Sequence, residues 1–433
     1  MKLQKIINSD LCNRCGSCVG LSNGKIIFDD KIGNYLPKIL LPLDNQEDDF
    51  LYSVCSGKGF DFPKNNQELF PNTPHHKYIG AYKKIFIGYA NKEEIRSKAA
   101  SGGIISGILI WLLENNFIDG AVVTRMSPKE PWLTEAFIAT SKEEILESAQ
   151  SKYIITSVNE ILPEIERFHG KLAYVGLPGQ VQSIRNLNKI RPDSVKAIKY
   201  IFGPFYGNTL HFSSIISLLR SYGEKNYTNI KKLYFRHGEW PGKMRIELSD
   251  NRIFELKKFH ANYLIPFHIL KNSLLCTDLS NEFTDISGGD AWAPVYEERG
   301  KGFSIVIARN EESLNLLKLL QNEKVLHLNE ISVEEAITMH SHGYDLKKRG
   351  AFIRLTFRRF LGKINPAYNY TISGFTFTRY LMELLLDSMF IILNNKLSRR
   401  IVEIIPLSII GALFENARDI WKKLTFSIKR KDL

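Results

Sequence analysis

Cys12-Asn13-Arg14-Cys15-Gly16-Ser17-Cys18 spaces three cysteines two residues apart, and a fourth follows in Val54-Cys55-Ser56-Gly57. A C-x2-C-x2-C turn wraps three thiolates around one face of a cubane cluster, and one remote cysteine can bind the fourth iron. Gly16 fits this reading, because glycine permits the close turns that aim backbone N–H groups at sulfur. The spacing therefore predicts one [4Fe-4S] cluster held by Cys12, Cys15, Cys18 and Cys55.

A zinc knuckle is the alternative for these cysteines. Zinc sites usually combine two separated cysteine or cysteine/histidine pairs, and no second pair accompanies this turn. The long interval between Cys18 and Cys55 departs from a two-cluster ferredoxin, in which the fourth cysteine follows within a few residues, so this would be a shortened, one-cluster version.

The chain has 433 residues, of which 44% are hydrophobic, so it can bury a large core in two or three domains. Its first residues are not followed by the apolar core of a signal peptide, and an exposed cluster would not suit an oxidising compartment. The apolar stretch 401–414 is too short to cross a bilayer and contains Glu403 and Pro406. We therefore expect a cytoplasmic protein.

The net charge of +12 is unevenly distributed, because residues 346–363 contain seven basic residues and no acidic one. Such a segment could bind anionic lipid at the inner membrane face or an acidic protein partner. The alternative is a solvated helix face. Nucleic acid is not expected as a partner, because no recognised binding motif accompanies the charge.

Hydrophobic patterns predict an α/β fold in the centre of the chain. Helical patterns, including 102–115, lie between several of the buried strands that we predict. These strands are 85–89, 120–124, 171–176, 197–203 and 303–308. Residues 244–248 and 252–256 predict a β-hairpin, an antiparallel addition. From about residue 330 the chain is predicted to be mostly helical, with amphipathic helices at 352–361, 379–393 and 413–426.

Three glycine-containing segments could hold a cofactor: 98–103, 176–180 and 287–292. The first leads into a helix, where exposed N–H groups, the Ser101 hydroxyl and two glycines would make an anion cradle. The second follows a strand and precedes a helix, at the sheet edge where ligands bind. The third places flexible glycines before Asp290 and Trp292. Each could equally be an ordinary cap or turn.

As an ordered set, these motifs resemble the coenzyme F420 hydrogenase/dehydrogenase beta-subunit family. The resemblance covers residues 8–345 and includes 114–121, Ser151-Lys152-Tyr153 and Cys276-Thr277-Asp278. It implies an iron-sulfur flavoprotein in which electrons pass between the cluster and a flavin, with FAD favoured over FMN. The cofactor-binding residues would be Ser101, Gly102, Gly103, Ser151, Lys152, Tyr153, Gly179, Gln180 and Asp290.

The resemblance also implies roles and boundaries. Lys152 would balance cofactor phosphates or a reduced flavin ring, and Tyr153 would stack or hydrogen-bond. We expect a ferredoxin-like domain at 1–78, a flavin-binding domain at 79–345 and a basic, mostly helical region at 346–433. Expected partners are a redox donor such as a ferredoxin or a partner subunit, and an organic substrate or the deazaflavin coenzyme.

Departures from the family pattern are informative. Typical members have cysteines where this chain has Gly179, Tyr206 and Ser273, and together with a cysteine such as Cys276 these can hold a further, inner cluster. A single thiolate cannot hold a cubane. We therefore infer that this branch has lost the inner cluster and that Cys276 is a small buried apolar residue.

The predicted function is that of an oxidoreductase, because a flavin joins the one-electron chemistry of a cluster to two-electron organic reductions. Three alternatives remain: a deazaflavin oxidoreductase, an electron-transfer subunit without substrate chemistry, and a scaffold that has lost redox function. The intact cysteine set and the segment 101–103 argue against the scaffold.

Overall fold

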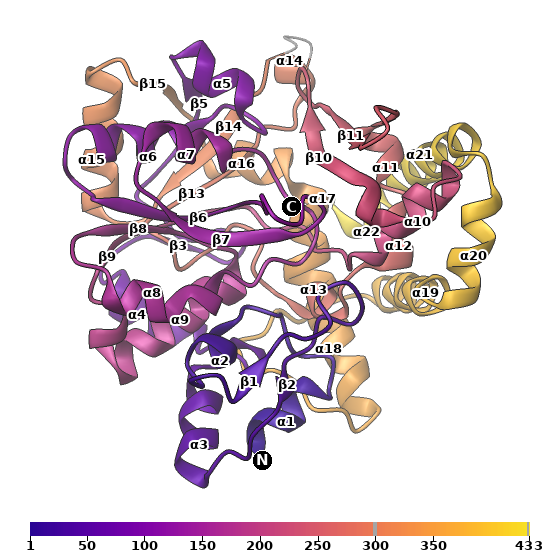
Figure 1. The fold of residues 1–433 in the computed structure, drawn as a ribbon, viewed down its shortest axis with the longest axis horizontal. Coiled ribbons are helices and arrows are strands. Elements are labelled where there is room, and N and C mark those ends of the chain that lie inside the picture. Colours follow the sequence, from indigo (N-terminus) through magenta and orange to yellow (C-terminus); the bar gives the residue numbers. More distant parts are fainter. Residues whose placement is uncertain (298–300, 431–432) are drawn as a thin grey trace.

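A mixed sheet of eight strands forms the centre of the protein (Figure 1). The computed structural model describes residues 1–297, 301–430 and 433. In spatial order the strands are β15 (Leu326–Glu330), β5 (Lys84–Ala90), β14 (Ser304–Ala308), β13 (Ile286–Asp290), β9 (Ile198–Pro204), β8 (Leu172–Val175), β6 (Gly120–Met126) and β7 (Thr134–Ala139). The four strands from β13 to β6 run parallel, and the pairs on either side are antiparallel.

Helices cover both faces of this sheet (Figure 1). One face carries α5 (Glu93–Lys98), α6 (Ile104–Glu114), α7 (Lys142–Glu147) and α15 (Glu311–Asn322), and the other carries α8 (Leu162–Arg167) and α9 (Pro178–Ile190). Every residue of β14 is buried, as expected for a strand covered on both sides. The structure thus confirms a mixed α/β core followed by a helical C-terminal region.

The five predicted strands and the predicted hairpin are present. The hairpin strands β11 (Lys243–Leu248) and β12 (Ile253–Lys257) pair with β10 (Ile230–His237) in a separate three-stranded sheet. The expectation of a flexible glycine loop at 287–290 is wrong, because these residues form strand β13 between β9 and β14. A Cβ at Gly289 would lie 2.5 Å from the Phe205 ring, so this glycine serves close packing. Strands β7 and β15 were not predicted.

The first 81 residues form small elements packed beside α8 and α9 (Figure 1). They are α1 (Lys2–Ile7), α2 (Ser17–Gly20), β1 (Ile26–Ile27), β2 (Lys38–Ile39), α3 (Asn45–Val54), the 3-10 turn η1 (Ser56–Lys58), α4 (Phe62–Leu69), β3 (His75–His76) and β4 (Gly80–Ala81). A capping box starts α3: the Asp44 carboxylate accepts from the Glu47 N–H at 2.8 Å, and the Glu47 carboxylate accepts from the Asp44 N–H at 3.0 Å.

The remaining short helices lie between strands or, from α16 on, lead from the last strand to the C-terminal region. They are η2 (Val158–Ile161), η3 (Pro192–Val195), α10 (Ser213–Ser221), η4 (Tyr227–Asn229), α11 (Lys258–Ala261), α12 (Leu264–His268), α13 (Lys271–Leu275), α14 (Pro294–Glu297), α16 (Val333–Met339), α17 (Ser341–Tyr344) and the π-helical turn η5 (Asp345–Gly350).

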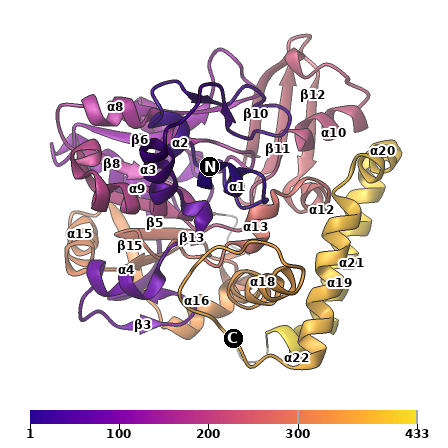
Figure 2. The ribbon, with the colours of Figure 1, turned by 90° about the horizontal axis from the view of Figure 1, so that it is seen from below.

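The C-terminal region is helical, as predicted, and its helices form an outer layer of the molecule (Figure 2). They are α18 (Ala351–Phe360), α19 (Phe377–Leu393), α20 (Lys396–Ile404), α21 (Leu407–Leu424) and α22 (Phe426–Lys429). Pro406 divides the apolar stretch 401–414 between α20 and α21. In the described part of the chain, no helix combines the length and the apolarity needed to span a membrane.

The basic segment 346–363 is not the solvent-facing surface that its composition suggested. Lys347, Lys348 and Arg354 are each at most 1% exposed. Lys348 pairs with the buried Glu282, and Lys347 Nζ donates to the Ser273 carbonyl at 2.5 Å. These three side chains cannot attract an external anionic partner, so the prediction that the whole segment faces one is wrong.

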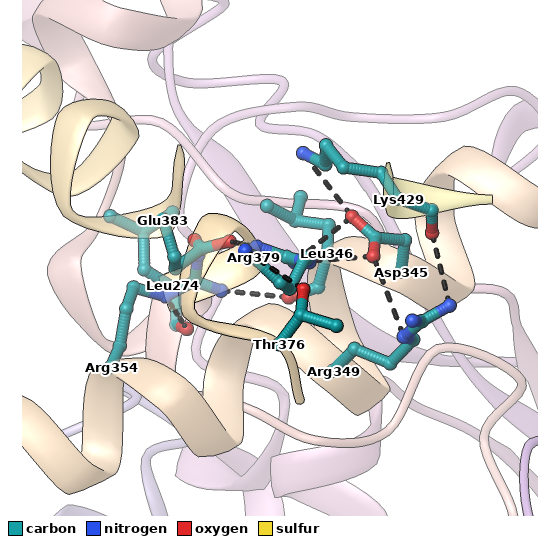
Figure 3. Close-up of polar contacts among 9 residues, drawn as sticks. All are labelled: Leu274, Asp345, Leu346, Arg349, Arg354, Thr376, Arg379, Glu383 and Lys429. Atoms are coloured by element: carbon teal, nitrogen blue, oxygen red, sulfur yellow. Dashed lines mark hydrogen bonds and ion pairs between the residues drawn. The ribbon is translucent and has the colours of Figure 1, made fainter. Parts of the chain in front are cut away.

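A buried ion cluster attaches α19 to the preceding helices (Figure 3). Arg379 Nη2 lies 3.1 and 3.2 Å from the two carboxylate oxygens of Asp345, and its Nη1 donates to Glu383 Oε2 at 2.7 Å. Arg354 pairs with the other oxygen of Glu383, and Lys429 Nζ lies 3.2 Å from Asp345 Oδ2. Burial alone would raise the pKa of Glu383, but Arg354 and Arg379 outweigh it and hold that pKa below its usual range.

Candidate functional site

The four N-terminal cysteines line one cavity. Its other walls include Leu3, Ile6, Ile7 and Pro37. Cys12 and Cys15 are buried, and Cys18 and Cys55 are half-buried. A thiol-lined, largely apolar cavity suits a group that is bound through sulfur and shielded from water.

The backbone of the cysteine turn is shaped for close approach. Gly16 begins α2 with a φ of 93°, and a Cβ there would lie 2.6 Å from the Glu160 N–H nitrogen. Arg14 also has a positive φ, 57°. The left-handed conformation at Gly16 and its packing against η2 both require glycine.

Burial opposes ionisation of the cysteine thiols. It raises the pKa of Cys12, raises that of Cys18 further, and together with the neighbouring Cys15 and Cys12 raises that of Cys55 to about 12. Thiolates in this cavity therefore need compensating positive charge, which bound iron would supply while releasing protons. Within the described residues, no group of three or more His, Cys, Asp or Glu side chains is placed to hold a single metal ion.

The cysteine turn is fixed to the α/β core by hydrogen bonds. Cys15 Sγ lies 3.6 Å from the hydroxyl of Ser183 on α9, and the Cys15 carbonyl accepts from the Asn159 N–H at 2.9 Å. The Ser157 hydroxyl donates to the Arg14 carbonyl at 2.9 Å. Ser183, which no sequence signal indicated, is the core side chain that reaches a cysteine sulfur.

Gly179 and Gln180 lie at this junction. The Gly179 carbonyl accepts from the Ser56 hydroxyl at 2.6 Å, and a Cβ at Gly179 would overlap the Asn13 amide. Gln180 Nε2 donates to the Thr156 carbonyl at 2.8 Å, and its Oε1 accepts from the Leu177 N–H at 2.8 Å. These contacts give both residues a structural role next to the cysteine turn, and their contact with a flavin stays a prediction.

Protein side chains also occupy the positions associated with an inner cluster. The Tyr206 hydroxyl lies 2.6 Å from Ser273 Oγ, and Lys347 Nζ lies 4.3 Å from the centre of the Tyr206 ring. Burial raises the pKa of the Cys276 thiol, which suits a neutral packed residue.

A second cluster of polar side chains is centred on Arg236 of β10, which is 2% exposed. Its Nη1 donates to the Tyr153 hydroxyl at 3.1 Å and to Asp290 Oδ2 at 3.2 Å, and its Nη2 donates to the Ala100 carbonyl at 2.6 Å. One guanidinium thus joins three segments in which the sequence placed cofactor residues: 98–103, 151–153 and 287–292.

Positive charge and aromatic rings dominate this cluster. Lys258 Nζ lies 4.8 Å from the centre of the Trp292 ring and 5.6 Å from that of Tyr153. Burial would raise the pKa of Tyr153, but Lys258 and Arg236 lower it to about 8. The same two cations outweigh burial at Asp290 and lower its pKa.

Two buried polar atoms of this cluster have no hydrogen-bond partner among the described residues: Asp290 Oδ1 and Trp240 Nε1. The Trp240 and Trp292 rings are 5.0 Å apart. Buried orphaned polar atoms are costly unless something pairs with them. Together with the aromatic surfaces and the cations they fit an anionic, ring-containing cofactor.

The remaining predicted cofactor residues are engaged by the protein itself. Lys152 Nζ donates to the Ala149 carbonyl at 2.8 Å and to the Gln150 carbonyl at 3.2 Å, just after the end of α7. Its role with cofactor phosphates stays a prediction. Gly102 N–H donates to Ser304 Oγ at 2.9 Å, and the Ser101 hydroxyl lies 2.7 Å from the same atom.

Packing requires a glycine at position 102, and the start of a helix requires one at position 103. A Cβ at Gly102 would overlap the Gly88 carbonyl of β5, and Gly103 begins α6 with a φ of 77°. A bulky residue at Gly102 would therefore distort the sheet and cannot report on a cofactor. Ser151 is half-buried.

A single short segment, residues 153–159, contacts both clusters. Tyr153 binds Arg236 at one end, and Ser157 and Asn159 bind the cysteine turn at the other. Six residues of extended chain span at most about 20 Å. The cysteine cavity and the Arg236 cluster are therefore neighbouring parts of one structural unit.

Comparison with known proteins identifies the relationships of the chain. Two family models describe the N-terminal and the C-terminal part of the coenzyme F420 hydrogenase/dehydrogenase beta subunit, and they match residues 85–163 and 169–334 respectively. The coenzyme F420-dependent sulfite reductase of Methanocaldococcus jannaschii is 23% identical over 364 residues, which are 80% of this chain and 52% of that protein. The chain thus spans about half the length of that relative.

Two further relationships come from Methanosarcina barkeri. Its coenzyme F420 hydrogenase subunit beta is 26% identical over 286 residues, which are 60% of this chain and 94% of that protein. A solved structure of the F420-reducing [NiFe] hydrogenase complex contains a chain with a TM-score of 0.53 and 20% identity, covering 68% of this chain and 99% of that one. This structural likeness shows a shared fold.

The α/β core and the matched segments define an oxidoreductase subunit. The chain belongs to the coenzyme F420 hydrogenase/dehydrogenase beta-subunit family, whose proteins carry iron-sulfur clusters and a flavin.

Proposed function

We propose that the protein is an iron-sulfur flavoprotein oxidoreductase with one [4Fe-4S] cluster, bound by Cys12, Cys15, Cys18 and Cys55, and a flavin, preferably FAD, held at the Arg236 cluster. The observation that carries this proposal is the segment 153–159, which contacts both the cysteine turn and Arg236. When bound, a flavin would join one-electron transfer at the cluster to two-electron chemistry on an organic substrate.

The residues at the two ends would have different tasks. Arg236 and Lys258 supply positive charge for cofactor phosphates or an anionic ring, while Asp290 Oδ1 and Trp240 Nε1 offer polar contacts. At the other end, Ser183 lies close enough to Cys15 Sγ to donate a weak hydrogen bond to a thiolate. Such bonds orient the ligand and tune the potential of its cluster.

We assign one cluster because the alternative position is occupied by protein. Four separate irons of a cubane take one thiolate each, and only the N-terminal set supplies four. The hydrogen bond between Tyr206 and Ser273 and the overlap at Gly179 leave that position without thiolates other than Cys276.

The substrate class is an organic two-electron acceptor or donor. The deazaflavin coenzyme is the specific candidate, because two relatives carry coenzyme F420 in their names. An electron-transfer subunit that passes electrons to a partner without substrate chemistry is the second candidate, because the cavity lined by the four N-terminal cysteines would be sufficient for it.

The visible spectrum of the protein tests the proposal. Anaerobically purified protein should show iron-sulfur and flavin bands together, with about four irons per chain. Iron-sulfur bands without flavin would favour the electron-transfer subunit. A colourless protein, after reconstitution with iron, sulfide and FAD, would contradict both functions.

Replacing Lys258 tests the flavin position. Lys258→Met should weaken flavin binding roughly 10- to 100-fold, because a charge-assisted contact in a half-buried site is lost, while the iron content stays unchanged. Flavin retained on gel filtration and its dissociation constant give the measurement. Lys199→Met is the matched control, since Lys199 also lies 4.8 Å from the centre of an aromatic ring, that of Tyr200. Equal flavin retention by both variants would place the cofactor elsewhere.

A further inference from the structure

The outer face of α19 carries an apolar stripe. Phe377, Leu381, Leu384, Leu385 and Ile392 are between 48% and 81% exposed. Their positions differ by 4, 7, 8 and 15 from the first, so they share one side of the helix. Five large exposed apolar side chains on one side of a helix far exceed the scattered exposure that is normal for a surface.

The opposite side of α19 is fixed to the protein. Arg379 and Glu383 point inward and join the buried ion cluster with Asp345 and Arg354 (Figure 3). Rotating α19 to bury the stripe would separate these charged side chains from their partners, at a large free-energy cost. The helix is therefore held with its apolar side facing outward.

The next two helices repeat the pattern. On α20 the exposed positions Leu397, Ile401 and Ile404 share one side, and on α21 the corresponding residues are Ile409, Leu413, Ile420 and Leu424, all between 50% and 83% exposed. Helices α19, α20 and α21 lie along one side of the molecule, with α20 between the other two (Figure 1). We call these three stripes the apolar arm face.

Exposed basic side chains accompany the apolar arm face. Residues 377–424 contain seven basic and five acidic residues. Among the basic ones, Arg379 is buried in the ion cluster, whereas Lys396, Arg400 and Lys423 are exposed on α20 and α21. A second copy docked on this face would bring the same positive charge against it. An anionic lipid leaflet offers both an apolar interior and compensating negative charge.

We propose that the apolar arm face lies in the plane of an anionic membrane surface, with its Leu, Ile and Phe side chains inserted among the acyl chains and its lysines and arginines at the headgroups. The binding is peripheral, by amphipathic helices lying in the interface. It rests on residues 377–424, and it differs from attraction by the segment 346–363, in which Lys347, Lys348 and Arg354 are buried.

Vesicle co-sedimentation of the full chain, prepared anaerobically, tests this proposal. The protein should pellet with phosphatidylcholine vesicles containing phosphatidylglycerol, and raised salt should weaken but not abolish pelleting, because the apolar contribution is insensitive to screening. Leu384→Ser/Leu385→Ser should reduce the partition coefficient roughly 10- to 100-fold, since two leucines lose their burial in the bilayer. Both side chains are exposed, so the variant should keep its iron content and its unfolding midpoint.

The matched control is Ile253→Ser, which changes a 50% exposed apolar residue on β12 and should leave vesicle binding unchanged. Absence of pelleting with anionic vesicles at low salt would overturn the proposal, and so would equal pelleting by wild type and the leucine variant. A dimer in solution that dissociates in the leucine variant, without vesicle binding, would assign the face to contact between copies and would also overturn it.

Discussion

Cys15→Ser protein, prepared anaerobically, should lose most of its iron and its iron-sulfur absorbance, falling from about four irons per chain toward none. Cys15 is buried in the cavity that all four N-terminal cysteines line, and the remaining cysteine, Cys276, lies outside that lining. A serine hydroxyl is a much poorer iron ligand than a thiolate at neutral pH, so three sulfurs would have to hold the cluster alone. Iron and sulfide analysis, with electron paramagnetic resonance after reduction, gives the measurement.

Cys276→Ser is the control for this result, because Cys276 is also a shielded cysteine. Its Sγ donates to the Asp278 carbonyl at 3.6 Å, a contact that a serine hydroxyl can replace. This variant should keep about four irons per chain. Equal iron loss in both variants, or close to eight irons in the wild type, would show that the position of Tyr206 and Ser273 holds a second cluster after all.

The cysteine turn and the main strands were predictable because their signals are local. Two-residue spacing brings Cys12, Cys15 and Cys18 together in any compact turn, and the continuous apolar run 304–308 needs burial on both faces to be stable. Such signals depend on neighbouring residues only. They do not require knowledge of which distant segment covers them.

The position of Arg236 at the centre of a polar cluster could not be predicted, because its partners are distant in sequence. Tyr153 and Asp290 lie 83 and 54 positions away from it, and the hairpin signal that indicated β11 and β12 gives no direction for a side chain on β10. The burial of basic residues in the segment 346–363 could not be predicted for the same reason. Lys348 is neutralised by Glu282, 66 positions away. Because the segment 346–363 contains no acidic residue itself, its basic side chains were predicted to face solvent or an external partner.

Glycine signals were ambiguous for a different reason. A glycine next to a ligand and a glycine next to another strand have the same cause, close approach of the backbone. Gly102 and Gly289 prove to pack against Gly88 and Phe205, while the nearby Ala100 reaches Arg236 through its carbonyl. Sequence alone does not distinguish these two uses.

The ion cluster under α19 leads to the largest stability effect that we expect. Glu383→Gln keeps the shape of the side chain but removes its charge, so Arg354 and Arg379 lose their shared carboxylate in a site where both are 1% exposed. Removing one partner of a buried pair destabilises proteins by about 3 to 5 kcal/mol. Urea unfolding of the wild type and the variant should show a difference of this size, with helices of the C-terminal region unfolding first.

The pH dependence and a matched variant complete this test. Because the folded pKa of Glu383 lies below its usual value, its contribution is fully present above about pH 4.3, the usual glutamate value, and is lost as the pH falls. The difference between wild type and variant should therefore narrow in acid. Glu94→Gln, which removes an exposed partner 2.7 Å from Lys142, should leave the unfolding midpoint nearly unchanged. Equal midpoints for Glu383→Gln and wild type would show that water reaches this cluster, and the fixed orientation of the apolar stripe on α19 would lose its physical basis.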